Sequence, residues 1–206
     1  PAENTFEIHN TTLFLNGNLT IESGYKLKLI NTNLIANTTS NAQNRISVQD
    51  GANLALVNSS ILSTVSENKF SLTNNGTLTF TNRVQIRGGA IMARNNLTIP
   101  TGAYVIMADS NISMDSTPSK QLEIRIETGS RLSLVNQAVS ATNPSMPYRI
   151  MGNGKLVTCG AIITDDIQYG IRLEPLDGKT RHVELGGGTE YPVKITNVGT
   201  ATDVID

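Results

Sequence analysis

The chain has 206 residues and a formal net charge of -1, which fits one domain, or one domain with part of a second. Asn, Thr and Ser together far outnumber the charged residues, which make up 16% of the chain; aromatic residues make up 4%, and there is a single cysteine. This composition excludes a disulfide framework or a cysteine-rich metal site, and the lack of a Lys/Arg cluster argues against a nucleic-acid groove or a membrane-binding patch.

The excess of Asn, Thr and Ser predicts an all-β chain. These side chains compete with the backbone for hydrogen bonds and therefore weaken helices. Thr favours strands, whereas Asn favours turns. With 38% apolar residues the chain can still build a core, so wholesale disorder is not expected.

The chain opens with Pro1–Asn4, which has neither a basic stretch nor an apolar segment, so a signal peptide is not expected at this start. Phe6–Leu13 then matches the later half of a repeat that recurs along the sequence. Turn glycines mark this repeat about every 26 residues, at Gly24, Gly51, Gly76, Gly102, Gly129 and Gly154. An apolar-x-apolar pair follows each glycine, at Leu27/Leu29, Leu54/Leu56, Leu78/Phe80, Val105/Met107, Leu132/Leu134 and, less strictly, Leu156/Thr158.

The repeat predicts a right-handed parallel β-helix over residues 1–167, built from three-strand coils of about 26 residues. Period-2 alternation gives each strand one buried face, and a three-strand unit can bury that face only by stacking on another unit. Right-handed winding is the default for parallel connections. An antiparallel β-sandwich is the rival architecture, but its strands have no reason to recur in threes with one register.

A column of Asn residues is expected at one corner of the coils. Two residues beyond each apolar pair stand Asn31, Asn58, Asn82, Asp109 and Asn136, with Asn10 in the opening segment. Asn tolerates the left-handed backbone of a tight corner, and stacked amides can hydrogen-bond along the axis. Asp109 and Gly160 are expected to interrupt this ladder, and Thr and Ser to occupy outward strand faces. One carboxylate at Asp109 offers too few oxygen donors for calcium.

Seven Asn-x-Ser/Thr sequons indicate a secreted protein only weakly. Asn10 and Asn58 belong to the expected ladder, so their amides should be engaged and poorly accessible. Asn18, Asn37 and Asn96 fall next to strands, in expected loops, and are the better glycosylation candidates. The same sequons also arise wherever a turn Asn precedes a strand Thr.

The repeat fades near Tyr169, and residues 168–206 form a second segment. Its strand-like runs surround the turn Gly186-Gly187-Gly188 and end in the spacing Asn197/Gly199/Asp203. This segment resembles the opening strands of immunoglobulin-like modules common in archaeal and bacterial surface proteins. Two to four strands are too few for a closed sandwich, so either the parent protein continues or these strands pair with a neighbouring molecule.

The repeats resemble Asn-rich right-handed β-helix domains of extracellular surface proteins, particularly archaeal cell-envelope proteins. The resemblance covers about Phe6 to Asp166 and implies a fold and a location at the cell surface. It leads us to expect a structural subunit of a sheath, surface layer or filament that self-associates through its solenoid ends and C-terminal strands. Expected partners are other copies, cell-surface proteins or glycans; nucleic acid and membrane insertion are not expected.

Catalysis is not expected, and no cofactor or metal is implied. The acidic residues are scattered, Asp165-Asp166 are strand neighbours that point to opposite faces, and His9 and His182 lie far apart. Cys159 is expected to be a packed, inert thiol. A polysaccharide lyase and a carbohydrate-binding module remain as alternatives; the latter would use Tyr25 and Tyr104, the tyrosines that follow turn glycines.

Overall fold

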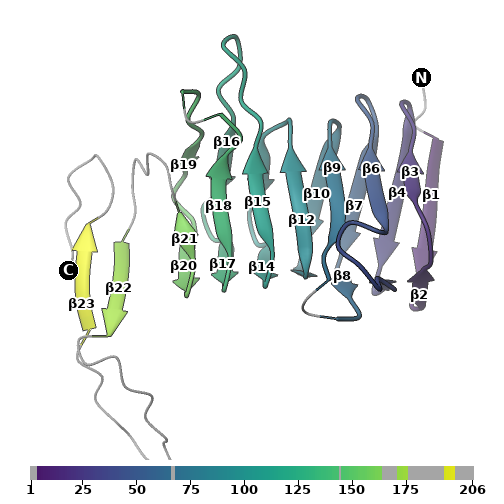
Figure 1. Cartoon of the computed structure of the whole chain (residues 1–206), viewed down its shortest axis with the longest axis horizontal. Coiled ribbons are helices and arrows are strands. Elements are labelled where there is room, and N and C mark those ends of the chain that lie inside the picture. Colours follow the sequence, from purple (N-terminus) through teal and green to yellow (C-terminus); the bar gives the residue numbers. More distant parts are fainter. Residues whose placement is uncertain (1–3, 66–67, 144, 164–170, 176–192, 198–206) are drawn as a thin grey trace, which may run out of the picture.

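The computed structural model describes residues 4–65, 68–143, 145–163, 171–175 and 193–197. Between residues 4 and 163 the chain winds into a parallel β-solenoid of about six turns (Figure 1). The described residues contain strands, turns and bends but no helix. The prediction of an all-β parallel β-helix is therefore confirmed, while the hand of its winding stays a prediction.

The solenoid is a three-sided prism. Its first side is sheet A, continued along the axis by sheet D, and the other two sides are sheets B and C. Sheet A contains β1 (Asn4–His9), β4 (Tyr25–Ile30), β7 (Asn53–Val57) and β10 (Thr77–Thr81). Sheet D contains β13 (Leu97–Ile99), β16 (Glu123–Ile126) and β19 (Arg149–Met151).

Sheets B and C run the whole length of the described solenoid. Sheet B contains β2 (Thr12–Leu15), β5 (Asn33–Ala36), β8 (Ser60–Ser63), β11 (Arg83–Arg87), β14 (Tyr104–Ala108), β17 (Arg131–Val135) and β20 (Lys155–Cys159). Sheet C contains β3 (Leu19–Ile21), β6 (Arg45–Val48), β9 (Phe70–Asn74), β12 (Gly89–Ala93), β15 (Asn111–Met114), β18 (Ala138–Ala141) and β21 (Ile162–Ile163).

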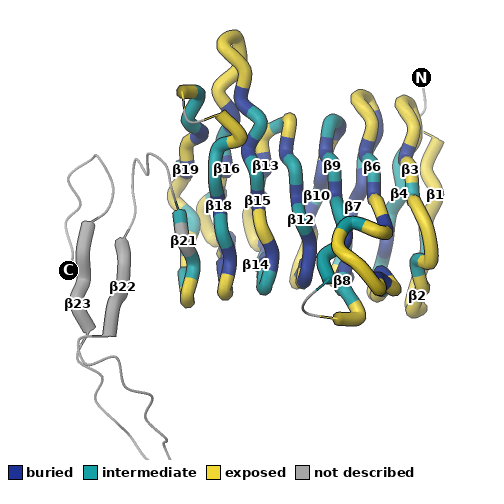
Figure 2. Tube along the Cα trace, in the orientation of Figure 1, coloured by how far each residue is buried: buried dark blue, intermediate teal, exposed yellow. Residues whose placement is uncertain are grey.

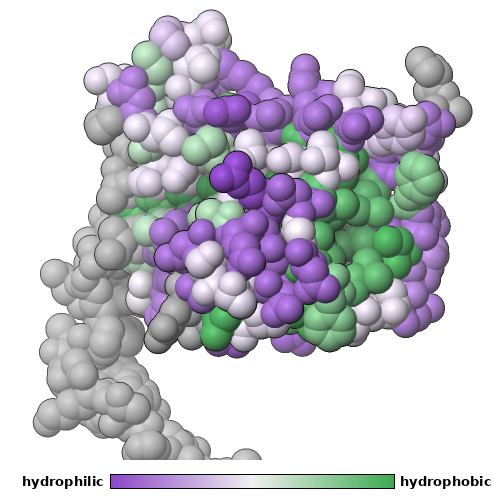
Figure 3. Space-filling view, turned by 45° about the vertical axis from the view of Figure 1, so that its right-hand side comes forward, coloured by the Kyte–Doolittle hydropathy of each residue, from purple (hydrophilic) through white to green (hydrophobic). Residues whose placement is uncertain are grey.

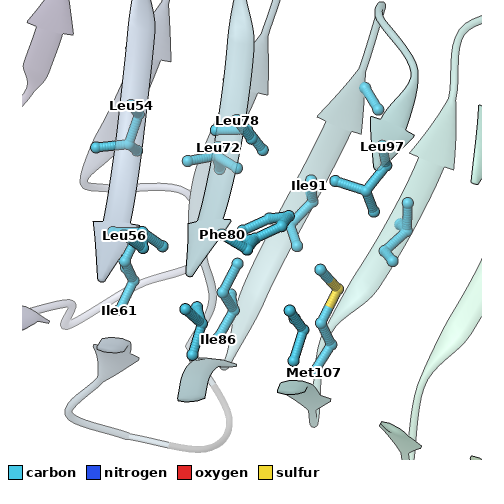
Figure 4. Close-up of a cluster of buried hydrophobic side chains, with 14 of the residues drawn as sticks. Leu54, Leu56, Ile61, Leu72, Leu78, Phe80, Ile86, Ile91, Leu97 and Met107 are labelled. Carbon is cyan, nitrogen blue, oxygen red and sulfur yellow. The ribbon is translucent and has the colours of Figure 1, made fainter. Parts of the chain in front are cut away.

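The core lies inside the prism, where apolar side chains from all three sides meet (Figure 4). Alternate residues of each strand point inward, so Leu54 and Leu56 of β7 are buried together with Leu72 of β9 and Ile61 of β8. The parallel register stacks equivalent residues, for example Leu27 on Leu54 and Leu54 on Leu78. Each coil thus covers the apolar face of the next coil.

The sequence pattern predicts that equivalent strands of all repeats lie on the same side of the prism, and this prediction is wrong at one point. The stretch between Gly76 and Gly102 holds four strands, β10 to β13, whereas the stretch between Gly24 and Gly51 holds three. Val105 of β14 therefore lies on Val84 of β11, and not on Leu78 of β10. Single-residue corners after β10 and β11 leave room for the extra strand, and the columns step to the next side of the prism.

This step reveals a longer repeat, the ten-strand repeat, whose first set is β1 to β10 and whose second set is β11 to β20. At one constant offset in sequence, which takes Leu19 to Leu97, strands β3, β5, β6, β7, β8 and β10 recur with identical bounds as β13, β15, β16, β17, β18 and β20. The other four, β1, β2, β4 and β9, recur within one residue at each end. Ten strands are one more than three coils require, so the second set starts one side further round: β1 lies in sheet A and β11 in sheet B.

The turn glycines serve two different purposes. Gly24, Gly51, Gly102 and Gly129 have φ between +74° and +80°, a conformation that a Cβ disfavours. Gly76 lacks a positive φ, but a Cβ there would lie 2.3 Å from the Gln49 carbonyl oxygen and 2.4 Å from that of Ala52. Gly154, its counterpart in the second set, is confined in the same way by Glu127.

Beyond the solenoid, the structure describes β22 (Ile171–Pro175) and β23 (Val193–Asn197), which pair with each other in antiparallel orientation. The turn Gly186-Gly187-Gly188, Gly199, Asp203 and the predicted domain boundary between residues 167 and 168 lie outside the described residues. The immunoglobulin-like character of this segment therefore stays a prediction.

We expect Gly76→Ala to lower the free energy of unfolding by about 3 kcal/mol or more, because its Cβ would strike two backbone carbonyl oxygens that cannot rotate away. Gly17→Ala is the matched control, since Gly17 has no positive φ and nothing within 4 Å of a built Cβ. Its effect should stay within about 0.5 kcal/mol. Thermal unfolding followed by circular dichroism compares the two, and equal losses would contradict the steric explanation.

Candidate functional site

A ladder of Asn side chains occupies the corner between sheets A and B. Asn31 Nδ2 donates to Asn10 Oδ1 at 3.0 Å, and Asn58 Nδ2 donates to Asn31 Oδ1 at 2.9 Å. These three residues and Asn82 have φ between +48° and +58°, in the left-handed region. The amides therefore link successive coils where the backbone turns.

Asp109 and Asn136 belong to a second ladder, at the corner between sheets B and C. This ladder runs through Gly88, Asp109, Asn136 and Gly160, all with positive φ. Asn136 Nδ2 donates to Asp109 Oδ1 at 3.3 Å, and Arg87 Nε donates to Asp109 Oδ2 at 3.0 Å. The six positions aligned from the sequence therefore occupy two corners, because the columns step one side between Asn82 and Asp109.

Sequence reasoning missed a hydroxyl directly after three of the ladder residues. Thr32, Ser59 and Ser110 are buried, although Thr and Ser were expected on outward faces. Ser59 Oγ donates to the carbonyl oxygens of Leu29 and Val57, at 2.9 and 2.8 Å, and accepts from Thr32 N at 3.0 Å. Ser59 and Ser110 thus accept from the N–H groups of Thr32 and Gly89 at the corner, and their bonds to carbonyl oxygens add to backbone bonds such as that from Asn31 N to Val57 O. The signal was present as Asn-Thr, Asn-Ser and Asp-Ser at the ladder positions.

The glycosylation candidates are exposed but engaged. Asn37 Nδ2 donates to Asn16 Oδ1 at 3.1 Å, Asn18 Oδ1 accepts from Arg45 N at 3.2 Å, and Asn96 Oδ1 accepts from Glu123 N at 3.0 Å. The side-chain amides of the ladder residues Asn10 and Asn58 are engaged, as expected, but both residues are exposed and not poorly accessible as expected. Exposure therefore does not separate the two groups of sequons.

The strongest candidate site is the first coil, which forms one open end of the described solenoid. Strands β1, β2 and β3 each lie at the edge of their sheet. Phe6, on the core side of β1, is 63% exposed and stacks on Tyr25 with ring centroids 6.1 Å apart. Both rings line a hollow that continues over Leu19 and Leu27. Figures 2 and 3 show this end as exposed and largely apolar.

The ten-strand repeat supplies an internal comparison for this end. Val84 is the counterpart of Phe6 and is 0% exposed, because β8 of the preceding coil lies against β11. The same difference holds for three further half-buried residues and their buried counterparts: Ile8 with Ile86, Leu13 with Ile91, and Leu19 with Leu97. The first coil thus has a core surface of the kind that a neighbouring coil covers elsewhere in the chain.

No group of three or more His, Cys, Asp or Glu side chains that could hold a metal ion occurs among the described residues. Some of the carboxylates there form ion pairs, including Lys28–Glu7 and Arg94–Asp115, both at 2.9 Å. Cys159 is exposed, contrary to expectation, because its position in β20 alternates with the inward Thr158 and stacks on the outward Val135. Asp165, Asp166 and His182 lie outside the described residues.

A scan of protein-family models and searches of curated proteins and of solved structures find no match to this chain. Within the part of the chain that the structure describes, no helix has the length and apolar character needed to cross a membrane. The candidate site therefore rests on geometry.

We expect Asn58→Ala to destabilise the protein by about 2 kcal/mol, since Ala loses the amide bond to Asn31 and disfavours the left-handed φ of +48°. Asn58→Gly loses only the amide bond and accepts the φ, so its loss should be about half as large. Thermal or urea unfolding of the two variants separates these contributions. Equal losses of stability in the two variants would show that the left-handed φ of residue 58 does not contribute to the difference.

The Thr142 hydroxyl, 2.7 Å from Asp115 Oδ1, and the Arg94 guanidinium hold the pKa of the Asp115 carboxyl below its ordinary value of 3.8. A lowered pKa in the folded state stabilises the protein above the ordinary value, and this stabilisation disappears as the pH falls through the folded pKa. Asp115→Asn should therefore lower the melting temperature at pH 7 but hardly at pH 2.

Asp50→Asn is the control for this comparison, because Asp50 is exposed and makes no side-chain hydrogen bond or ion pair with the described residues. Its melting temperature should follow that of the wild type at both pH values. A gap between Asp115→Asn and the wild type that stays constant from pH 7 to pH 2 would contradict the assignment.

Proposed function

We propose that this protein is a structural subunit of a cell-surface assembly whose copies associate end to end through the ends of their solenoids. The observation that carries the proposal is the exposed core surface of the first coil, centred on Phe6. The occupant we assign to that surface is the last coil of a second copy.

The internal repeat supports a second copy as the occupant. Strands β11, β12 and β13 open the second set of the ten-strand repeat and lie against β8, β9 and β10, which close the first. The other end of the described solenoid presents β19 and β20, the counterparts of β9 and β10, together with β21, which lies on β18 as β11 lies on β8. A copy that presents its last coil to the first coil of another repeats a kind of contact that the chain already makes within itself.

The two ends differ, so the contact is head-to-tail. Heterologous contacts of this kind produce open filaments when the rotation between copies does not close a ring. A filament, sheath or layer follows from such stacking, since an uncovered sheet edge offers unpaired backbone groups to an incoming strand.

The extracellular location, the right-handed winding and the immunoglobulin-like C-terminal module belong to the same proposal. They are supported by the resemblance to Asn-rich surface proteins and by the abundance of exposed, uncharged Asn side chains along the corners. In this proposal the C-terminal strands β22 and β23 add a second contact between copies by strand pairing.

The proposal predicts that Phe6→Glu keeps the protein monomeric under conditions in which the wild type forms filaments. A carboxylate on the exposed core surface of the first coil would have to lose its hydration inside the contact between copies, which is costly. The side chain is 63% exposed in the single chain, so the fold itself should tolerate the change. Sedimentation velocity over a range of concentrations, with electron microscopy of the same samples, measures assembly.

Thr77→Glu adds the same charge to an exposed position in β10, on the side of the prism, and should assemble like the wild type. Circular dichroism confirms that both variants are folded. A wild type that stays monomeric at every concentration would refute the assembly, and assembly of Phe6→Glu at the wild-type level would refute its site.

A further inference from the structure

A row of cations follows one margin of the outer face of sheet B. Arg83, Arg131 and Lys155 are the first residues of β11, β17 and β20, and Tyr104 is the first residue of β14. The register pairs Arg83 with Tyr104, Tyr104 with Arg131, and Arg131 with Lys155. At ~4.8 Å per strand, these four residues, the cationic row, extend ~14 Å along the solenoid axis.

Tyr104 holds two of the cations in place. The Cζ atom of Arg83 lies 5.9 Å from the centroid of the Tyr104 ring, and that of Arg131 lies 5.0 Å from it. The ring is thus flanked by two guanidinium groups, each within reach of a cation–π interaction. Arg131 is held further by its Nε, which donates to Ser133 Oγ at 3.1 Å.

The cations of the row have no carboxylate partner within the part of the chain that the structure describes. Arg87, Arg94 and Arg125 each pair with a carboxylate at 2.9 to 3.0 Å. No carboxylate of the described residues forms an ion pair with any of the three cations in the row. Arg131 and Lys155 also stand directly opposite each other on neighbouring strands, where like charges destabilise the sheet. A bound anion would relieve this repulsion.

The surface beside the row is suited to sugar rings. The next outward positions are Gln85, Ile106 and Val157, in register around Ser133. They offer an amide for hydroxyl groups and aliphatic side chains for the apolar faces of the rings. We propose that the cationic row binds a linear acidic polysaccharide that lies along the solenoid axis with its carboxylate groups on Arg83, Arg131 and Lys155.

Two other polyanions fit the row less well. Single-stranded nucleic acid is held by bases that stack on aromatic faces. The guanidinium groups of Arg83 and Arg131 lie over the Tyr104 ring, where a base would have to stack. An acidic peptide that adds a strand needs a free sheet edge, whereas β11, β14 and β17 each have a neighbour on both sides. This site lies on the side of the prism and does not depend on end-to-end assembly.

Isothermal titration with polygalacturonate, a carboxylated polymer, tests the inference, and its fully methyl-esterified form provides the uncharged control. The wild type should bind the acid form and not the ester. Arg83→Gln combined with Arg131→Gln should weaken binding at least tenfold and flatten its salt dependence. Arg45→Gln combined with Arg149→Gln removes the same charge from the first residues of β6 and β19, in other sheets, and should change affinity less than twofold.

Tyr104→Phe should bind like the wild type, because the ring and not the hydroxyl contacts the guanidinium groups. Circular dichroism checks the fold of every variant. The inference is overturned if the wild type does not bind polygalacturonate, or if the two double variants lose affinity equally. It is also overturned if polyglutamate or a single-stranded oligodeoxynucleotide binds more tightly than the polysaccharide. The Phe6→Glu variant should bind normally, which separates this test from the test of assembly.

Discussion

Parallel stacking of coils at one strand spacing is the constraint on which the rest of this structure depends. Each strand uses its backbone groups on the coils before and after it, and each coil covers the apolar face of the next. Equivalent positions must then carry compatible residues, because they lie directly over one another. The corners show this most clearly, where left-handed Asn residues join coil to coil and buried hydroxyls such as Ser59 satisfy the backbone.

The ten-strand repeat shows how a chain can keep this constraint while turning its pattern around the axis. Because ten strands do not divide evenly over the three sides of the prism, each strand and corner residue of the second set lies one side further round than its counterpart in the first. Asn58 and Asn136 are counterparts in sequence, yet they serve different corners. The core is unaffected by this shift, because all three sides require the same inward alternation of apolar residues.

The same stacking leaves an uncompleted surface at the end of the described solenoid and a regular array on its sides. Phe6 is exposed because no further described coil lies against β1, although its counterpart Val84 is fully buried. On the outer face of sheet B, the register converts four residues distant in sequence into the cationic row. End-to-end assembly and binding of an acidic polysaccharide are separate proposals that draw on these two consequences of one fold.

The sequence by itself determined the all-β class, the inward alternation and the need for left-handed corners, because these depend on residue type and local spacing. Gly24, Gly51, Asn31 and Asn58 carry that information within a few residues. Only the tertiary structure decided which corner each residue occupies, since one extra strand between Gly76 and Gly102 changes every later register. For the same reason the sequence held no visible Lys/Arg cluster: Arg83 and Arg131 meet at Tyr104 only because the coils stack.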